Sequence, residues 1–162
     1  MSIVHVKGLS ELQEFLDKLP AKIEANIMRS ALRAGANVVK EEAKANVPVA
    51  SGLLRNGLKV STNSRRGVVT AKVKATGKHA YLARWVEYGT AAHKILPKES
   101  KSLFFGGVFL QGIEHPGQRP KPFMRPALDS RAQAALVAVA EGIKKRLNKQ
   151  GINTSDIEIG LP

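Results

Sequence analysis

The sequence predicts an α+β fold, in which a small antiparallel sheet packs against a long N-terminal helix and a C-terminal helix. Two patterns predict this fold. Apolar residues recur at helical spacing over residues 20–46 and again over 126–149, whereas they alternate with polar residues over 58–75. A spacing of 3.6 residues is typical of one helix face, and a period of two is typical of a half-buried strand.

The length of 162 residues suits one domain with a substantial core. We expect this domain to span residues 1–150, with an inserted loop or hairpin at 91–112, and a tail to follow at 151–162. At its start, Ile3 to Val6 are expected to form a short strand or arm that ends at Gly8. A short helix should come next, because leucines recur at helical spacing at Leu9, Leu12, Leu16 and Leu19.

The long helix is expected from about Pro20 to Asn46 and has two contrasting faces. One face is apolar and consists of Ile23, Ile27, Met28, Ala31, Leu32, Ala34, Val38 and Val39. The opposite face carries five cations within about 60° of one another: Lys22, Arg29, Arg33, Lys40 and Lys44. These cations indicate either a solvated helix face or a surface that meets DNA or an acidic neighbour. Gly35 inside the helix indicates close packing of another backbone.

A link and a hairpin are expected after this helix. Pro48 ends the helix, Ser51-Gly52 makes a turn, and Leu53-Leu54 can enter the core. Alternation over residues 58–75 places valines inward and lysines outward, around a polar turn at 63–67. The cations of this hairpin form a second candidate DNA-facing set: Arg65, Arg66, Lys72 and Lys74. Lys72 and Lys74 can also be edge lysines that prevent strand aggregation.

The middle of the chain predicts a short helix and a long insert. Tyr81, Trp85 and Tyr88 are spaced four and three apart, which favours a helix from Tyr81 to Tyr88. Within the insert, a strand pair is expected around Leu103–Phe105 and Val108–Leu110, turning at two glycines. We expect its phenylalanines Phe104, Phe105 and Phe109 to be buried, either against this domain or against a neighbouring subunit.

A proline-rich segment precedes the last helix. Prolines at 116, 120, 122 and 126 exclude a helix there and indicate an extended arm, which places Phe123 and Met124. Pro126 suits the first turn of a helix that should run from about Pro126 to Lys149. Its expected inward stripe is Leu128, Ala132, Leu136, Val139, Ile143 and Leu147. The tail, with Ile157 and Ile159, can be a free end or a strand that docks on another subunit.

The composition is strongly basic, with 26 Lys and Arg against 13 Asp and Glu, a net charge of +13. This balance predicts attraction to polyanions without sequence readout. Cysteine is absent, which excludes disulfides and thiolate metal sites. No apolar run resembles a signal peptide or approaches the roughly 20 residues of a membrane span, so we expect a soluble protein made in the cytoplasm.

Catalytic signals are weak, and we expect no enzyme, no metal and no cofactor. The four histidines His5, His79, His93 and His115 are scattered, with no pair at metal-ligand spacing. Glu87 lies beside aromatic residues, where a carboxyl could act as a general acid with a raised pKa. The favoured interpretation is that Glu87 bonds to a nearby cation or to the backbone turn at Gly89-Thr90.

Three motifs in order resemble a known family. They are Val47-Pro48-Val49-Ala50-Ser51-Gly52-Leu53-Leu54-Arg55, Val86-Glu87-Tyr88-Gly89-Thr90 and Pro122-Phe123-Met124-Arg125-Pro126-Ala127-Leu128. With the long helix, they resemble the tail-component family of neck and tail-completion proteins in tailed phages and prophages, over roughly residues 8–148. The insert from Lys94 to Gly112 is longer than the short link of that family. The motif residues expected to have structural roles are Gly52, Glu87, Gly89, Thr90, Pro122, Phe123, Arg125 and Pro126.

The resemblance implies a structural virion protein at the head-tail junction, in a neck, tail-completion or tail-terminator role. It implies a homo-oligomeric ring, expected to be sixfold, that contacts a head-closing connector protein and the tail-tube protein. Double-stranded DNA would pass through the ring without sequence preference, and assembly would take place in the host cytoplasm, with no membrane involved. The two basic sets are candidates for the channel lining, and the subunit-interface candidates are Phe104, Phe105, Phe109, Ile157 and Ile159.

Two other functions stay open. A stand-alone basic module that binds duplex DNA would be a monomer or dimer in solution, with an affinity that falls steeply with salt. A small hydrolase would work from Glu87 and a histidine, and the change Glu87→Gln would abolish its activity.

Overall fold

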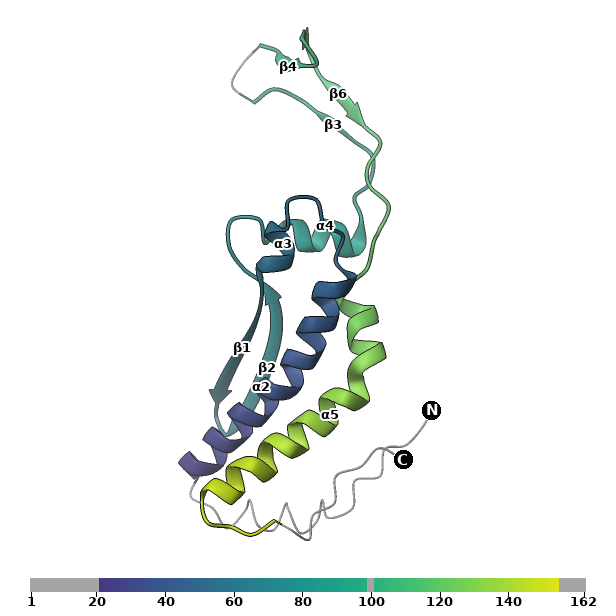
Figure 1. Cartoon of the computed structure of the whole chain (residues 1–162). Helices are drawn as coiled ribbons and strands as arrows, with labels where there is room; N and C mark the ends of the chain where they lie inside the picture. The colour runs from purple at the N-terminus through teal and green to yellow at the C-terminus, as the bar shows by residue number, and fades with distance from the viewer. Residues whose placement is uncertain (1–20, 99–100, 155–162) are drawn as a thin grey trace.

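The computed structural model describes residues 21–98 and 101–154, which form an elongated body and a projecting arm (Figure 1). Two long helices run side by side in the body, α2 (Ala21–Asn46) and α5 (Met124–Lys149). A hairpin of β1 (Leu58–Arg65) and β2 (Val68–Ala75) packs on α2. The fold is therefore α+β, as the two periodicities predicted.

Helices α2 and α5 approach each other closely where small residues face each other. A Cβ added at Gly35 would lie 2.7 Å from the backbone oxygen of Ala135, and one added at Gly142 would lie 2.9 Å from Cα of Ala31. No real side chain tolerates such distances, so both glycines allow backbone-to-backbone packing. The prediction that another backbone packs at Gly35 is confirmed.

The hairpin is regular along its whole length. Leu58 pairs with Ala75 at one end and Arg65 pairs with Val68 at the other. Only Arg66 and Gly67 form the turn, and both have positive φ, 51° and 78°, as in the tight turns that match the twist of a hairpin. The expected turn at 63–67 is therefore too long, because the strands continue through polar residues up to Arg65.

The core consists of two groups of buried side chains along α2. The first lies near the C-terminal end of α2 and consists of Val39, Ala43, Val47, Leu54, Leu58, Phe123 and Ala127. The second lies near its N-terminal end and consists of Ile27, Ala31, Ile143 and Leu147. Phe123 is fully buried, so the extended segment before α5 delivers one large aromatic side chain into the first group.

The expected inward stripe of α5 is wrong in its first half. Ile143 and Leu147 are buried, but Leu128 and Leu136 are 53% and 54% exposed and Ala132 is also exposed. Ala127 and Ala135 face α2 in their place. Small residues permit the close approach of α5 to α2, so Ala127 and Ala135 form the contact between the two helices. The larger leucines lie beside this contact.

Two short helices close the end of the body from which the arm projects (Figure 1). They are α3 (Leu53–Asn56), which the sequence did not predict, and α4 (Leu82–Tyr88), which agrees with the helix predicted there. Gly52 precedes α3 with a left-handed φ of 75°. Of the two leucines expected in the core, Leu54 is buried and Leu53 is exposed.

The arm is a long antiparallel extension. Its stem pairs β3 (His93–Ile95) with β6 (Ile113–His115), and its tip is a hairpin of β4 (Leu103–Phe105) and β5 (Val108–Leu110). The tip agrees with the predicted strand pair, whereas the stem was not predicted. It brings His93 opposite His115, with ring centroids 5.0 Å apart, so two histidines that look scattered in the sequence are stacked.

Three expectations lie outside the described residues. They are the short strand at 1–8, the leucine-rich helix at 9–19, and the tail with Ile157 and Ile159.

Candidate functional site

The outer face of the β1–β2 hairpin carries a compact group of lysines. Lys59, Lys72 and Lys74 are exposed on the face turned away from α2, and Lys59 lies directly opposite Lys74 in the register. Like charges at opposed positions of a strand pair repel each other. Within the described part of the chain, no acidic side chain forms an ion pair with any of the three. A polyanion is the natural partner for such a surface.

The hairpin turn adds two arginines to this surface. Arg65 and Arg66 are both exposed at the end of the body that is opposite the arm. The hairpin set of cations thus extends from the turn to the start of β1. Edge protection of the sheet explains lysines along the strands, but it does not require arginines at the turn.

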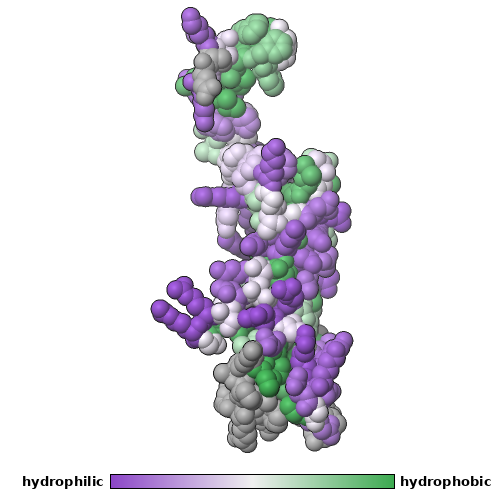
Figure 2. All heavy atoms as spheres, turned by 90° about the vertical axis from the view of Figure 1, so that its left-hand side faces the viewer, coloured by the Kyte–Doolittle hydropathy of each residue, from purple (hydrophilic) through white to green (hydrophobic). Residues whose placement is uncertain are grey.

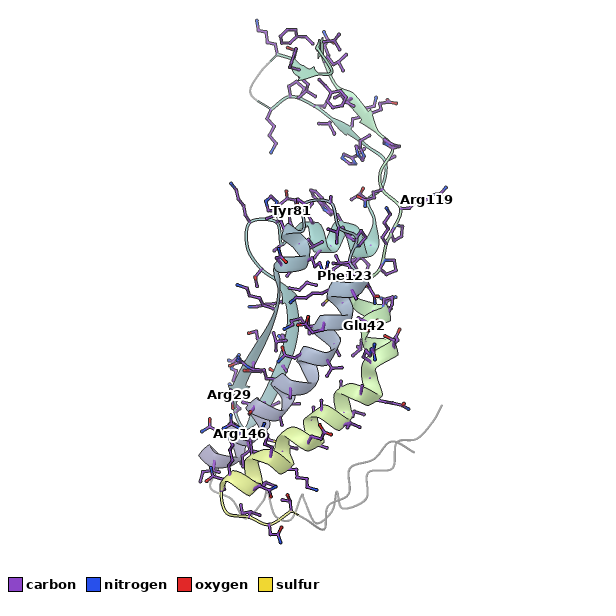
Figure 3. All side chains as sticks on the ribbon, in the orientation of Figure 1. Arg29, Glu42, Tyr81, Arg119, Phe123 and Arg146 are labelled. Carbon is purple, nitrogen blue, oxygen red and sulfur yellow. The ribbon has the colours of Figure 1, made fainter. Side chains whose placement is uncertain are left out.

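The N-terminal part of α2 borders the hairpin. The Arg33 guanidinium donates a hydrogen bond of 3.1 Å to Oγ1 of Thr62 on β1, so this member of the α2 set reaches the hairpin. Arg29 is exposed, and Arg146 of α5 lies at the same end of the body (Figure 3). Arg146 donates to Oγ of Ser30, which adds a third element to the basic surface.

The C-terminal part of α2 is closer to neutral. Lys40 and Lys44 both pair with Glu41, at 2.8 Å and 3.5 Å. The hydrogen bond from Lys40 and the charges of both lysines lower the pKa of Glu41 below its ordinary value. Glu41 therefore offsets part of the positive charge there. Lys22 lies in the first turn of α2, and its side chain is outside the described part.

We call the surface formed by the cations of the hairpin, of the N-terminal part of α2 and of the adjoining Arg146 on α5 the basic face. Its members are Arg29, Arg33, Lys59, Arg65, Arg66, Lys72, Lys74 and Arg146. Figure 2 looks toward the hairpin side and shows a mainly hydrophilic body below a hydrophobic arm tip.

Glu87 of α4 holds the N-terminus of α5. Its Oε2 accepts the backbone N–H groups of Phe123 and Met124 at 2.8 and 2.9 Å, and its Oε1 accepts that of Arg125 at 3.1 Å. The next residue, Pro126, has no N–H. One carboxylate thus bonds the three backbone donors that precede this proline, and its charge suits the positive end of the helix.

These hydrogen bonds affect the pKa of the Glu87 carboxyl. Burial raises the pKa of its carboxyl, but the three backbone hydrogen bonds and the charge of Arg125 outweigh burial, so the pKa lies below its ordinary value. The general-acid interpretation needs a raised pKa, whereas these contacts lower the pKa of Glu87. The favoured interpretation was a nearby cation or the backbone turn at Gly89-Thr90. The charge of Arg125 does act on Glu87. The backbone donors that Glu87 binds, however, lie 36 to 38 residues further along the chain and not in that turn.

The two ends of the arm meet beside Glu87. Thr90 and Gln118 exchange backbone hydrogen bonds of 2.9 and 3.0 Å, and Lys121 N–H donates to the carbonyl of Val86. Gly89 has a φ of 73°, and a Cβ there would lie 2.5 Å from the Gln118 oxygen. The structure thus joins two of the sequence motifs, 86–90 and 122–128, into one joint at the base of the arm.

Large apolar side chains are exposed at several places away from the basic face, including the arm tip and α4. At the arm tip, Phe104, Phe105 and Phe109 are 68%, 66% and 75% exposed, so this domain does not bury them. At the start of α4, Trp85 and the preceding Tyr81 are exposed with their rings edge to face, 5.0 Å apart. Exposed apolar groups of this kind mark contact surfaces for other proteins.

The described residues show neither a cluster of metal-ligand side chains nor a helix that could cross a membrane. They contain no group of three or more His, Cys, Asp or Glu side chains arranged to hold an ion. His115 Nδ1 accepts the backbone N–H of Gly117 at 3.0 Å, so it is committed to the local turn. Among the helices described, none has the length and hydropathy of a membrane span.

Sequence reasoning missed two residues of the basic face. Lys59 shares the outward period of Lys72 and Lys74 along the hairpin, so the alternation contained the signal for it. Arg146 carried no such signal, because its position next to α2 depends on how the two long helices cross.

Comparison with known families gives one match. Residues 10–89 match the model of the HK97-gp10-like family, described as "Bacteriophage HK97-gp10, putative tail-component". No curated protein and no solved structure matches the chain. The matched segment includes α2, the β1–β2 hairpin and α4, and it ends at Gly89, before the arm. Over residues 10–89, the chain is similar to the HK97-gp10-like family of phage tail components.

Proposed function

We propose that the chain is a structural protein of the phage head-tail junction, in a tail-completion or tail-terminator role, and forms a ring through which DNA passes. The supporting observation is the basic face. Lys59 and Lys74 stand directly opposite each other, and within the described part no acidic side chain pairs with the hairpin cations. A channel for a genome needs this kind of surface, since phosphates attract it without base readout.

The hairpin is the better candidate for the channel lining than the C-terminal part of α2. Lys40 and Lys44 share the counter-ion Glu41, whereas Lys72 and Lys74 point outward from the sheet. We therefore assign the basic face to the channel and the rest of the α2 set to the flank of the ring.

The apolar tip of the arm supports assembly. Three phenylalanines that are two-thirds or more exposed are costly in water and are expected to be covered in the working form. In the proposal, the ring is sixfold, and its other partners are the head-closing connector protein and the tail-tube protein. The protein would be part of the virion, and no catalysis is needed.

Native mass spectrometry of the full chain, alone and mixed with the tail-tube protein, tests the proposal. The expected result is one closed multiple of the chain mass, with six copies, in at least one of the two samples. The double change Phe104→Ser and Phe105→Ser should abolish that species, whereas Val68→Ser, at an exposed apolar position on the hairpin, should not. A monomer under both conditions would contradict the ring.

The basic face also supports a second function, a stand-alone module that binds duplex DNA. This function predicts a monomer or dimer for which the logarithm of the affinity for a random-sequence duplex falls linearly with the logarithm of salt concentration. The mass measurement separates the two functions, because only the first requires a closed oligomer.

A further inference from the structure

The body contains an apolar groove that the described residues leave open. It has a volume of about 990 Å³ and lies between β2 and α5, with α2 as its floor and α4 at one end. Its apolar lining includes Leu32, Val39, Val69, Val73, Leu128 and Leu136. Leu128 and Leu136 are about half exposed along its α5 wall. These two leucines lie outside the contact between α5 and α2.

The β2 wall of the groove is also a sheet edge. In the described part of the chain, β2 pairs only with β1, so its other edge has backbone donors and acceptors without a strand partner. An open edge beside an apolar groove is suited to accept an additional strand, because hydrogen bonding and side-chain burial then occur together.

The arm tip has the matching properties. It is a hairpin of two three-residue strands, and Phe104 packs against Phe109 with ring centroids 5.1 Å apart. Val108 and Leu110 of the same hairpin are also exposed. The stem holds the tip beyond the α4 end of its own body, away from the groove (Figure 1). The tip and the groove are therefore complementary surfaces that one copy does not bring together.

We propose that the β4–β5 tip of one copy occupies the groove between β2 and α5 of the next copy. This inference rests on the proposed ring. A protrusion on one copy that fits a different surface on the next makes a head-to-tail contact, and such contacts close into rings when the rotation between copies permits.

The area involved is appropriate for such a contact. A buried phenylalanine covers roughly 150 Å² or more, so the three of the tip supply on the order of 450 Å² from one side. A stable interface needs about 800 Å² per partner. The three phenylalanines thus supply roughly half of that area. The exposed Val108 and Leu110 of the tip, together with strand pairing along β2, add the remaining contact.

Disulfide trapping tests the contact directly, since the chain has no cysteine. We would introduce Phe109→Cys at the tip and Ala132→Cys in the groove and oxidise the assembled full chain. The expected result is a ladder of covalent multimers on a denaturing gel. A mixture of the two single variants should give only a covalent dimer. The matched control pairs Phe109→Cys with Leu53→Cys, another exposed helical position outside the groove, and should give no ladder.

A second pair of variants uses assembly itself as the readout. Leu136→Glu places a charge in the groove wall and should weaken assembly at least tenfold. Leu53→Glu changes a leucine of similar exposure on α3 and should leave assembly unchanged. The melting temperatures of the two variants, measured at a concentration below assembly, should agree.

Three outcomes would overturn the inference. If the variant with Phe109→Cys and Ala132→Cys forms closed oligomers but gives no covalent ladder, the contact between tip and groove is refuted. The proposed ring is not refuted by that result. A cross-link within one chain, or between Leu12→Cys and Ala132→Cys, would assign the groove to the chain's own residues. A monomer under every condition would refute the proposed ring as well.

Discussion

Oε2 of Glu87 accepts the backbone N–H of Phe123 at 2.8 Å, and this bond connects α4 to the start of α5 across the base of the arm. Phe123 itself is fully buried between the two long helices and the hairpin. Figure 3 places it between the C-terminal end of α2 and the first turn of α5. One residue pair therefore fixes the helix start, the core and the direction from which the arm leaves the body.

We expect Glu87→Gln to lower the free energy of unfolding by about 1–3 kcal/mol at neutral pH, since three backbone donors lose a charged acceptor. Because the folded state holds the pKa of Glu87 below its ordinary value, its stabilisation is complete above the unfolded pKa, roughly 4.3, and is lost as the pH falls through the folded value. Urea denaturation of both proteins, from neutral pH down to about 3, should show the difference shrinking in acid.

The matched control is Glu141→Gln, at an exposed position on α5, which should change stability by no more than about 0.5 kcal/mol. Equal effects of the two changes at neutral pH would refute the capping role of Glu87.

Phenylalanines at positions 123 and 105 should respond in opposite ways to truncation. Phe123→Ala creates a cavity in the first core group and should cost about 3–5 kcal/mol of unfolding free energy. Phe105→Ala removes a side chain that is 66% exposed and should change the stability of the monomer by about 0.5 kcal/mol or less. Thermal and urea unfolding measure both, and a large loss for Phe105→Ala would mean that the tip packs on its own body.

Gly35→Ala should destabilise the protein, although alanine favours a helix by about 1 kcal/mol over glycine. The added methyl group would overlap Cγ2 of Val139 and the backbone oxygen of Ala135, which forces α2 and α5 apart. We expect a net loss of about 1–3 kcal/mol in urea denaturation. At the exposed position 45 of the same helix, Ala45→Gly should show the ordinary propensity cost. A stabilised Gly35→Ala variant would contradict the close crossing.

Removing charge from the hairpin should weaken duplex binding in a salt-dependent manner. With Lys59→Gln and Lys74→Gln together, the slope of log affinity against log salt should fall by about 1.8, because each phosphate contact contributes about 0.9. Fluorescence anisotropy with a random-sequence duplex measures this slope. The double change Lys145→Gln and Lys149→Gln, at exposed positions on α5, should leave the slope unchanged. Equal slopes for both variants would exclude the basic face as the DNA surface.

Features that depend on local periodicity could be predicted from the sequence. The positions of α2, the two hairpin strands, α4 and the β4–β5 tip all follow from residues that are neighbours along the chain, although the ends of the hairpin strands at the turn do not. The non-helical segment that ends at Phe123 was also predicted, because its prolines leave few conformations open.

The features that the sequence did not reveal depend on contacts between distant segments. The pairing of β3 with β6 joins residues about twenty positions apart, and the partners of Glu87 lie still further away. The exposure of Leu128 and Leu136 depends on how closely Gly35 and Gly142 let the helices approach. Helical spacing identifies an apolar face, but it does not tell which part of that face meets the neighbouring helix.

An electron cryomicroscopy reconstruction of the purified oligomer would test the central claim most directly. The account predicts a closed ring whose central channel is lined by the outer face of the β1–β2 hairpin, with Lys59, Lys72 and Lys74 of every copy pointing inward. An open filament, or a closed ring whose channel is lined by α5 while these lysines face outward, would contradict it.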